Sequence, residues 1–290
     1  MAKLEYTFKN DTLFKMLFVK NPDLLKRLVA ELLGVQYCSI GKFAITNPEM
    51  PPEAIGDKFC RLGINMTVDG QRVDLEIQVR DESDFPERTL FHWAREYSTS
   101  LGEGDSYIEL PQVVIISIVA FRIFACREYH SEFQALEVTR HILLTDRMSL
   151  QYYELPKLPG KVSADNALEL WLKLFDADTE EELRQIEELE VPVMQQAIGA
   201  YRSVTAEEEF RTLERMRSDA RRNEASALAN ARREAVEETN AKWQGVVKEK
   251  DAKWQGVVKE KDTALAKNQA ALAEKDAEIA RLRAMLGENK

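Results

Sequence analysis

The chain has 290 residues, enough for one large domain or two modest ones with a core of ordinary size. Its 40 basic and 50 acidic side chains give a formal charge of −10 and a sequence pI near 5.1. This balance argues against a protein that binds nucleic acid through its overall charge. A nucleic acid would have to meet a local basic patch or a bound metal ion.

The three cysteines, Cys38, Cys60 and Cys126, lie far apart and form neither a C-x-x-C pair nor a zinc-binding set with the three histidines. We therefore expect reduced thiols in a cytoplasmic protein. The N-terminal residues include no apolar signal region, and no stretch approaches the roughly 20 apolar residues of a membrane span. We expect a soluble protein without a membrane partner.

The first part of the chain predicts helices. Residues 10–18 favour a short helix, and residues 22–33 place their leucines on one helical stripe. Pro22 and Gly34 stand where a helix typically begins and ends. A candidate strand follows near residues 36–45.

The next segment, residues 59–80, predicts a β-hairpin. Apolar and polar residues alternate on both sides of Asp69-Gly70, the strongest short-range hairpin signal. With these two residues as the loop, Val68 faces Gln71. The pairing then continues through Thr67–Arg72, Met66–Val73, Asn65–Asp74, Ile64–Leu75, Gly63–Glu76, Leu62–Ile77 and Arg61–Gln78.

The two faces of this hairpin differ in chemistry, because side chains alternate along a strand. One face is apolar, and the other carries Arg61, Gly63, Asn65, Asp74, Glu76 and Gln78. Directly opposed Cβ atoms lie about 4.5–5.5 Å apart, so two carboxylates at one such pair could share a divalent cation. The alternative is that the polar face is simply the wet face of an antiparallel hairpin.

The elements that follow complete a mixed α/β pattern. Residues 86–101 favour a helix, and the unbroken apolar run at 113–121 favours a strand buried on both faces. Residues 166–201 favour a helical subdomain or arm. This order predicts an α/β (α+β) fold in which helices flank a mixed sheet.

The C-terminal part of the chain predicts a coiled coil. The segment AKWQGVVKEKD occurs at 241–251 and again at 252–262, so Trp243, Trp254 and Leu265 lie eleven residues apart. Later apolar residues follow every seven positions: Leu265, Leu272, Ile279 and Leu286. Eleven-residue spacing favours a right-handed or nearly straight coil, and seven-residue spacing a left-handed one. We expect homo-oligomers, because an exposed apolar stripe needs cover; a single solvated helix is the alternative.

Several short motifs, taken in order, resemble those of a known family. They are Asp11-x-x-Phe14-Lys15, Asp74-Leu75-Glu76-Ile77-Gln78, Phe85-Pro86-Glu87-Arg88 before Trp93 and Tyr97, and Glu154-Leu155-Pro156-Lys157. Over about residues 8–160 the sequence resembles the PD-(D/E)XK nuclease superfamily, and within it the Rpn-type group of recombination-promoting nucleases and transposases. The resemblance rests on the order and spacing of the motifs, since each motif alone is weak.

This resemblance implies a PD-(D/E)XK-like mixed sheet flanked by helices, with Mg²⁺-dependent hydrolysis of DNA phosphodiester bonds in recombination or mobile elements. It divides the chain into a nuclease-like domain at 1–160, a helical subdomain or arm at 161–205, and a long helix or coiled coil at 206–290. DNA is the implied partner.

The resemblance also implies a site. In that family an acid on the first helix, an Asp on a strand and the Glu of a Glu-x-Gln or Glu-x-Lys motif surround the metal. Asp11 and Glu76 match the first and third of these and are the implied ligands of Mg²⁺ or Mn²⁺. Gln78 takes the last catalytic position, and Lys15 and Arg88 are candidate phosphate contacts. Alternatively, Asp11 is an ordinary helix N-cap.

The expected strand Asp would fall at position 63, where this sequence has Gly63. The hairpin pairing independently places that position opposite Glu76. The missing carboxylate predicts weak metal binding and slow or absent DNA cleavage, unless Asp74 on the same face takes over part of its role. Arg88 has its own alternative, since it could only offset the charges of Glu87 and Asp84.

Two functions therefore stay open. The first is a metal-dependent DNA endonuclease, impaired by Gly63. The second is a catalytically inactive family member that keeps the fold and acts through its coiled coil, as an oligomer or as the partner of another protein. A saturable effect of Mg²⁺ or Mn²⁺ would separate them, since only the first predicts it.

Overall fold

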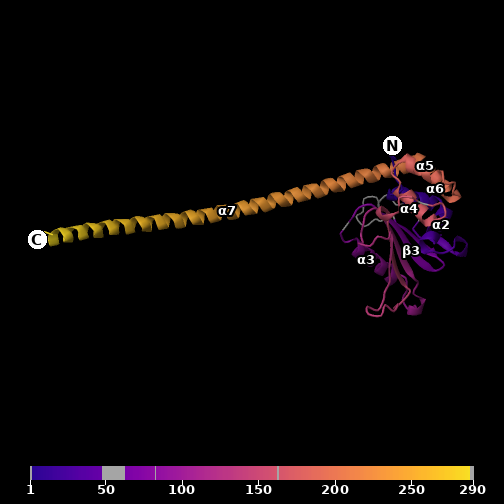
Figure 1. Ribbon diagram of the computed structural model, residues 1–290, viewed down its shortest axis with the longest axis horizontal. Helices are drawn as coiled ribbons and strands as arrows, with labels where there is room; N and C mark the ends of the chain where they lie inside the picture. The colour runs from indigo at the N-terminus through magenta and orange to yellow at the C-terminus, as the bar shows by residue number, and fades with distance from the viewer. Residues whose placement is uncertain (1, 48–62, 82, 162, 288–290) are drawn as a thin grey trace. The chain divides into compact units, whose positions relative to one another are not determined.

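The computed structural model of the protein describes residues 2–47, 63–81, 83–161 and 163–287. Contacts between Cα atoms divide the chain into two compact units, Met1–Arg221 and Arg222–Lys290. The first unit contains the sheet and its covering helices, and the second consists of the greater part of one long helix (Figure 1).

Six strands among the described residues form one sheet, in the order β1-β2-β3-β4-β6-β5. The strands are β1 (Phe43–Ile45), β2 (Ile64–Val68), β3 (Gln71–Gln78), β4 (Val113–Val119), β5 (His130–Phe133) and β6 (Met148–Glu154). β3, β4 and β6 run parallel to one another, whereas β1, β2 and β5 each run antiparallel to a neighbour. The predicted mixed sheet is confirmed.

Helices cover both faces of this sheet. They are α1 (Asp11–Lys20), α2 (Pro22–Leu33), α3 (Phe85–Ser98), α4 (Ala167–Asp176), α5 (Glu180–Glu187) and α6 (Pro192–Ala206), and the long helix α7 (Glu208–Gly287) follows them in the chain. The larger apolar core joins α1, α2, α4, α5 and α6 to one face, and a smaller core joins α3 to the other. Figure 1 shows β3 between α3 on one side and α2 on the other.

Local signals position the first two helices. Pro22 stands in the first turn of α2, and Gly34 ends it with a left-handed φ of 66°, as the sequence predicts. In α1 the N-cap is Asn10, whose side chain accepts a hydrogen bond from the backbone N–H of Leu13. The alternative that Asp11 is an ordinary N-cap is therefore wrong, because Asp11 is the first helical residue.

The predicted hairpin register is confirmed from Val68–Gln71 to Ile64–Leu75. Asp69 and Gly70 both have positive φ, 48° and 90°, as a two-residue hairpin loop requires. The predicted pairs Leu62–Ile77 and Arg61–Gln78 lie outside the described residues.

β4 is buried on both faces, which confirms that prediction. Val114 and Ile116 belong to the larger core, and Val113 and Ile115 to the smaller one. The strand ends at Val119, two residues earlier than expected.

Other elements differ from the prediction. The candidate strand at 36–45 is a 3₁₀ helix, Tyr37–Ser39, followed by the short strand β1. Residues 166–201 form three helices, because Thr179 builds a capping box at the start of α5 and Pro192 opens α6.

The long helix α7 presents apolar side chains to solvent. Its exposed large apolar residues are Met216, Leu228, Val236, Trp243, Val246, Val247, Trp254, Val257, Val258, Leu265, Leu272, Ile279, Leu282 and Met285. Across the described part of the chain, no helix is long and apolar enough to cross a lipid bilayer.

Candidate functional site

The candidate site lies on the face of β3 that is turned toward α3. Val73, Leu75 and Ile77 point into the larger core, so the alternating residues project to the opposite face. These residues are Arg72, Asp74, Glu76 and Gln78. The predicted separation of the hairpin into an apolar and a polar face is therefore correct for β3.

Glu76 is a buried carboxylate, only 5% exposed. It lies beside Ser117 on β4, whose hydroxyl donates a hydrogen bond of 3.4 Å to Glu76 Oε1. On the next strand, Tyr152 is paired with Ser117 and is hydrogen-bonded to Thr89 of α3. Burial raises the pKa of the Tyr152 hydroxyl, and the negative charge of Glu76 adds to this effect. A carboxylate buried among hydroxyl groups is well placed to bind a cation.

The space in front of Gly63 is filled by Asp74. An ideal Cβ on Gly63 would lie 2.9 Å from Asp74 Oδ1 and 3.6 Å from the Cβ of Glu76. The second distance confirms that position 63 lies beside Glu76, where the sequence predicted it. The first shows that the Asp74 carboxylate occupies the place where a side chain at position 63 would begin. This close approach gives the glycine a structural reason that the sequence did not supply.

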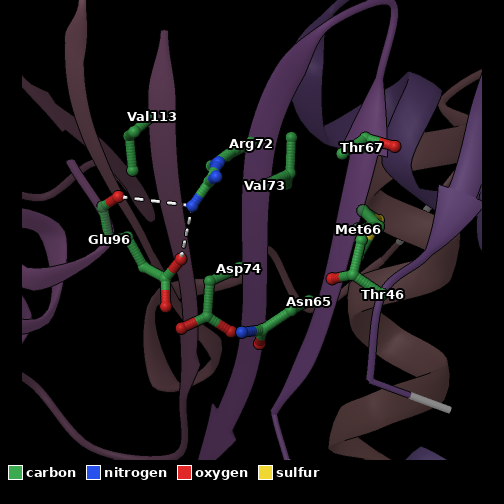
Figure 2. Close-up of a pocket in the computed structure, with 9 residues that line it drawn as sticks. All are labelled: Thr46, Asn65, Met66, Thr67, Arg72, Val73, Asp74, Glu96 and Val113. Carbon is green, nitrogen blue, oxygen red and sulfur yellow. Dashed lines mark hydrogen bonds and ion pairs between the residues drawn. The ribbon is translucent and has the colours of Figure 1, made fainter. Parts of the chain in front are cut away.

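The amide of Asn47 holds the start of β2 in place. Its Oδ1 accepts a 2.7 Å hydrogen bond from the backbone N–H of Asn65, and its Nδ2 donates a 3.0 Å bond to the carbonyl of Gly63. Asn65 in turn is the direct cross-strand partner of Asp74. Figure 2 shows the Asn65 amide and the Asp74 carboxylate pointing toward one another.

These side chains supply oxygen atoms of the kind that Mg²⁺ and Mn²⁺ prefer, so the donor chemistry fits such an ion. Asp74 and Glu76 are the two acids of this set, whereas the Asn65 carbonyl oxygen faces Asn47, 3.4 Å from its Nδ2. Among the residues that the structure describes, no group of three or more Asp, Glu, His or Cys side chains is arranged to hold a metal.

Asp11 lies in a different arrangement, at the start of α1. Arg217 and Arg221 of α7 both form ion pairs with its carboxylate, the second at 3.0 Å. Arg217 also donates a 2.7 Å hydrogen bond to the hydroxyl of Thr12. Burial lowers the pKa of the Arg217 guanidinium, and the charge of Asp11 opposes this effect.

A second set of ion pairs holds the other end of α1. Lys20, in its last turn, pairs with Glu207, just before α7, and with Glu209 in its first turn. The first turns of α7 therefore run along α1 in the opposite direction, and Phe210 of α7 belongs to the larger core. These pairs are not predictable from the sequence, because the partners are about 200 positions apart.

The other three predicted residues lie as follows. Lys15 is 3% exposed on α1. The Arg88 guanidinium lies over the ring of Phe85, 4.9 Å from its centre, at the start of α3. The amide nitrogen of Gln78 donates a 3.0 Å hydrogen bond to the carbonyl of Arg80. Their roles toward phosphate or water stay predictions.

A pocket of about 200 Å³ opens beside Asp74 (Figure 2). It is lined by Thr46, Asn65, Met66, Thr67, Arg72, Val73, Asp74, Glu96 and Val113. Arg72 extends toward Glu96 of α3, with its Nη1 3.6 Å from the carboxylate and 3.5 Å from the backbone carbonyl. Sequence analysis did not single out Arg72 or Glu96, because the two belong to separate elements.

A buried ion pair lies at the end of β6. The Glu154 side chain is fully buried, and its partner Lys157 is 5% exposed. Glu154 Oε1 also accepts hydrogen bonds from the backbone N–H groups of Ile123 and Phe124, at 2.6 and 3.3 Å. The pair therefore fastens the end of β6 to the loop that follows β4.

Comparison with known proteins agrees with this architecture. Residues 8–231 match the family model described as PD-(D/E)XK nuclease family transposase. No curated protein and no solved structure gave a match. The family match begins just before α1, covers the whole sheet and extends into α7. The chain therefore belongs to the PD-(D/E)XK nuclease family transposases.

Proposed function

We propose that this protein is a DNA endonuclease of low activity that depends on Mg²⁺ or Mn²⁺ and acts in recombination or on mobile elements. The observation that carries the proposal is the Asp74 carboxylate, which lies in front of Gly63 and beside Glu76. It supplies a second acid next to the position where the family resemblance places a metal ligand.

Glu76 and Asp74 would hold the cation. When bound, such a cation activates a water molecule and offsets charge on the scissile phosphate. Gln78 would orient a water molecule through its amide, but it lacks the positive charge that a lysine would bring. Asp11 starts α1, which packs on the opposite face of the sheet. It would join the site, directly or through a water molecule, only around the edge of the sheet and only after Arg217 and Arg221 release it.

Two features support low rather than full activity. Asp74 approaches the site from the neighbouring pair of the hairpin rather than from position 63, so its geometry differs from that of the missing Asp. In addition, two arginines neutralise the Asp11 carboxylate. The first feature alters the geometry of the ligands, and the second lowers the negative charge available to a divalent cation, on which the affinity of oxygen-ligand sites depends.

Replacing Glu76 with Gln tests this function. We expect saturable Mn²⁺ binding to be lost and Mn²⁺-dependent nicking of supercoiled DNA to fall by about 100-fold or more, since a metal contributes several kcal/mol of charge stabilisation. Calorimetry and a nicking assay measure the two effects. Glu103→Gln, the same change on an exposed loop, is the matched control. Equal activity of the Glu76→Gln variant and the wild type would refute the proposal.

A second function rests on the apolar stripe of α7, which favours self-association. On a straight helix an eleven-residue step rotates the stripe by about 20° in one direction, and a seven-residue step by about 20° in the other. From Trp243 to Ile279 two eleven-residue steps are followed by two seven-residue steps, so these rotations cancel. The stripe is thus nearly straight, and the helix of a second copy could cover it with little supercoiling.

Glutamates within this stripe should prevent assembly. We expect the full chain with Trp254→Glu and Leu265→Glu to have the mass of one chain, 33.3 kDa, where the wild type is a multiple of it. In an assembled coil, the new glutamates of adjacent helices would be buried beside one another without cationic partners, which opposes association. Light scattering measures the mass, and Gln255→Glu, beside the stripe, is the control. A wild type that is already a monomer would disprove the coiled-coil association.

A further inference from the structure

The residue that carries a further inference is Arg72, which lies on the same face of β3 as Asp74 and Glu76. At about 3.3 Å per residue, Arg72 lies roughly 13 Å along the strand from Glu76, with Asp74 midway between them. A cationic side chain therefore follows the two acids in one line. A nucleic-acid strand lying along this line would meet the acids and the arginine in succession.

The surroundings of Arg72 suit a phosphate group. Its pocket of about 200 Å³ is also lined by Thr46, Thr67 and Asn65, whose side chains carry hydrogen-bond donors. Figure 2 shows the guanidinium extending from β3 toward the carboxylate and the backbone carbonyl of Glu96. Arginine forms paired hydrogen bonds with phosphate oxygens, so both shape and charge match this ligand.

The present partner of Arg72 is exchangeable. Nη1 lies 3.6 Å from Glu96 Oε2, longer than a close charged hydrogen bond, and the two side chains are 36% and 33% exposed. Water reaches the pair, which weakens it. A phosphate could therefore replace the Glu96 carboxylate at the guanidinium without leaving a buried charge unpaired.

We propose that Arg72 binds a backbone phosphate of the DNA strand whose scissile phosphodiester lies at Glu76, and that Glu96 competes with that phosphate for the guanidinium. This inference rests on the proposed function. A cation held by Asp74 and Glu76 would offset the charge of Asp74, the other acid of the pocket. In the absence of DNA, Glu96 keeps the guanidinium inside the pocket.

The test measures binding of a labelled DNA duplex to the full chain by fluorescence anisotropy, in Mn²⁺ and over a series of salt concentrations. We expect Arg72→Gln to weaken binding about tenfold at low salt and to reduce the slope of log affinity against log salt by about one. Arg72→Lys should keep most of the slope, because it keeps the charge. The affinity for Mn²⁺ should not change.

Glu96→Gln should act in the opposite direction and tighten DNA binding, because it removes the competing carboxylate.

Arg140→Gln is the matched control for Arg72→Gln, since Arg140 forms a comparable exposed ion pair with Glu137, at 3.3 Å, outside the pocket. It should leave both the affinity and the slope unchanged.

The outcomes distinguish this inference from the function on which it rests. If the wild type binds Mn²⁺ and DNA but Arg72→Gln leaves the salt slope unchanged, the role of Arg72 is wrong and the proposed function stands. Equal losses of DNA affinity for Arg72→Gln and Arg140→Gln would show that the effect comes only from the change in net charge, and would overturn the inference. Weaker binding by Glu96→Gln would overturn the competition. A wild type that binds no DNA would refute both proposals.

Discussion

Replacing Gly63 with Asp is expected to raise the affinity of the protein for Mn²⁺ and the rate of Mn²⁺-dependent DNA nicking, each by about tenfold or more, because the number of charged ligands sets the affinity of oxygen-ligand sites. The new carboxylate would stand next to Glu76, at the position that the family resemblance assigns to a metal ligand. Its Cβ would lie 2.9 Å from Asp74 Oδ1, so the Asp74 side chain must rotate away.

The same substitution should destabilise the protein when no metal is present. It brings a third carboxylate close to Asp74 and Glu76, and like charges repel each other in a partly buried site. Mn²⁺ should then raise the melting temperature of Gly63→Asp more than that of the wild type, since binding to the folded state alone adds stability. Thermal unfolding with and without Mn²⁺ measures this difference.

Gly63→Ala is the control, because it introduces the same close contact with Asp74 without a carboxylate. It should lower stability and bring no gain in metal affinity or nicking. If the wild type were fully active, and a Glu76 substitution abolished that activity while Gly63→Asp brought no gain, the idea of an impaired site would be wrong. Asp74 would then already serve as the complete substitute.

Replacing Lys157 with Met is expected to lower the free energy of unfolding by about 3–5 kcal/mol, the largest effect on stability that we predict. The substitution would leave the carboxylate of Glu154 fully buried without its cation. The backbone N–H groups of Ile123 and Phe124 would still donate to that carboxylate, but they carry no full charge. Unfolding in urea, followed by circular dichroism, measures the change.

A double substitution separates loss of the ion pair from loss of packing. Lys157→Met combined with Glu154→Gln should recover much of the stability, because no unpaired charge then remains in the interior. Lys173→Met is the matched control. Its ion pair with Asp176 has the same three-residue spacing, but the side chains are 24% and 38% exposed. We expect a loss of no more than about 1 kcal/mol there, and equal losses at the two sites would contradict this account.

Features of the fold that depend on neighbouring residues were predictable from the sequence. The hairpin loop follows from Asp69-Gly70, because these residues adopt the positive φ angles that the loop needs. Once the loop is set, the strict alternation of side chains determines which residues face the core. The same holds for α2, whose ends are marked by Pro22 and Gly34.

Features that depend on distant residues were not predictable. β6 joins the sheet beside β4 and β5 beside β6, and nothing in their own sequences specifies those neighbours. The pairing of Arg72 with Glu96 depends on where α3 lies over β3, and the pairing of Asp11 with Arg217 depends on how α7 packs along α1. Sequence spacing carries no information about such contacts.

The candidate site has features that were predictable from the sequence and others that were not. That Glu76 faces position 63, which lacks a carboxylate, follows from the sequence alone, because the register of a hairpin is set by its loop and its alternation. That the Asp74 carboxylate fills the space in front of Gly63 and that two arginines hold Asp11 is visible only in the folded chain. These arrangements depend on side-chain packing and on contacts between segments that only the complete fold brings together.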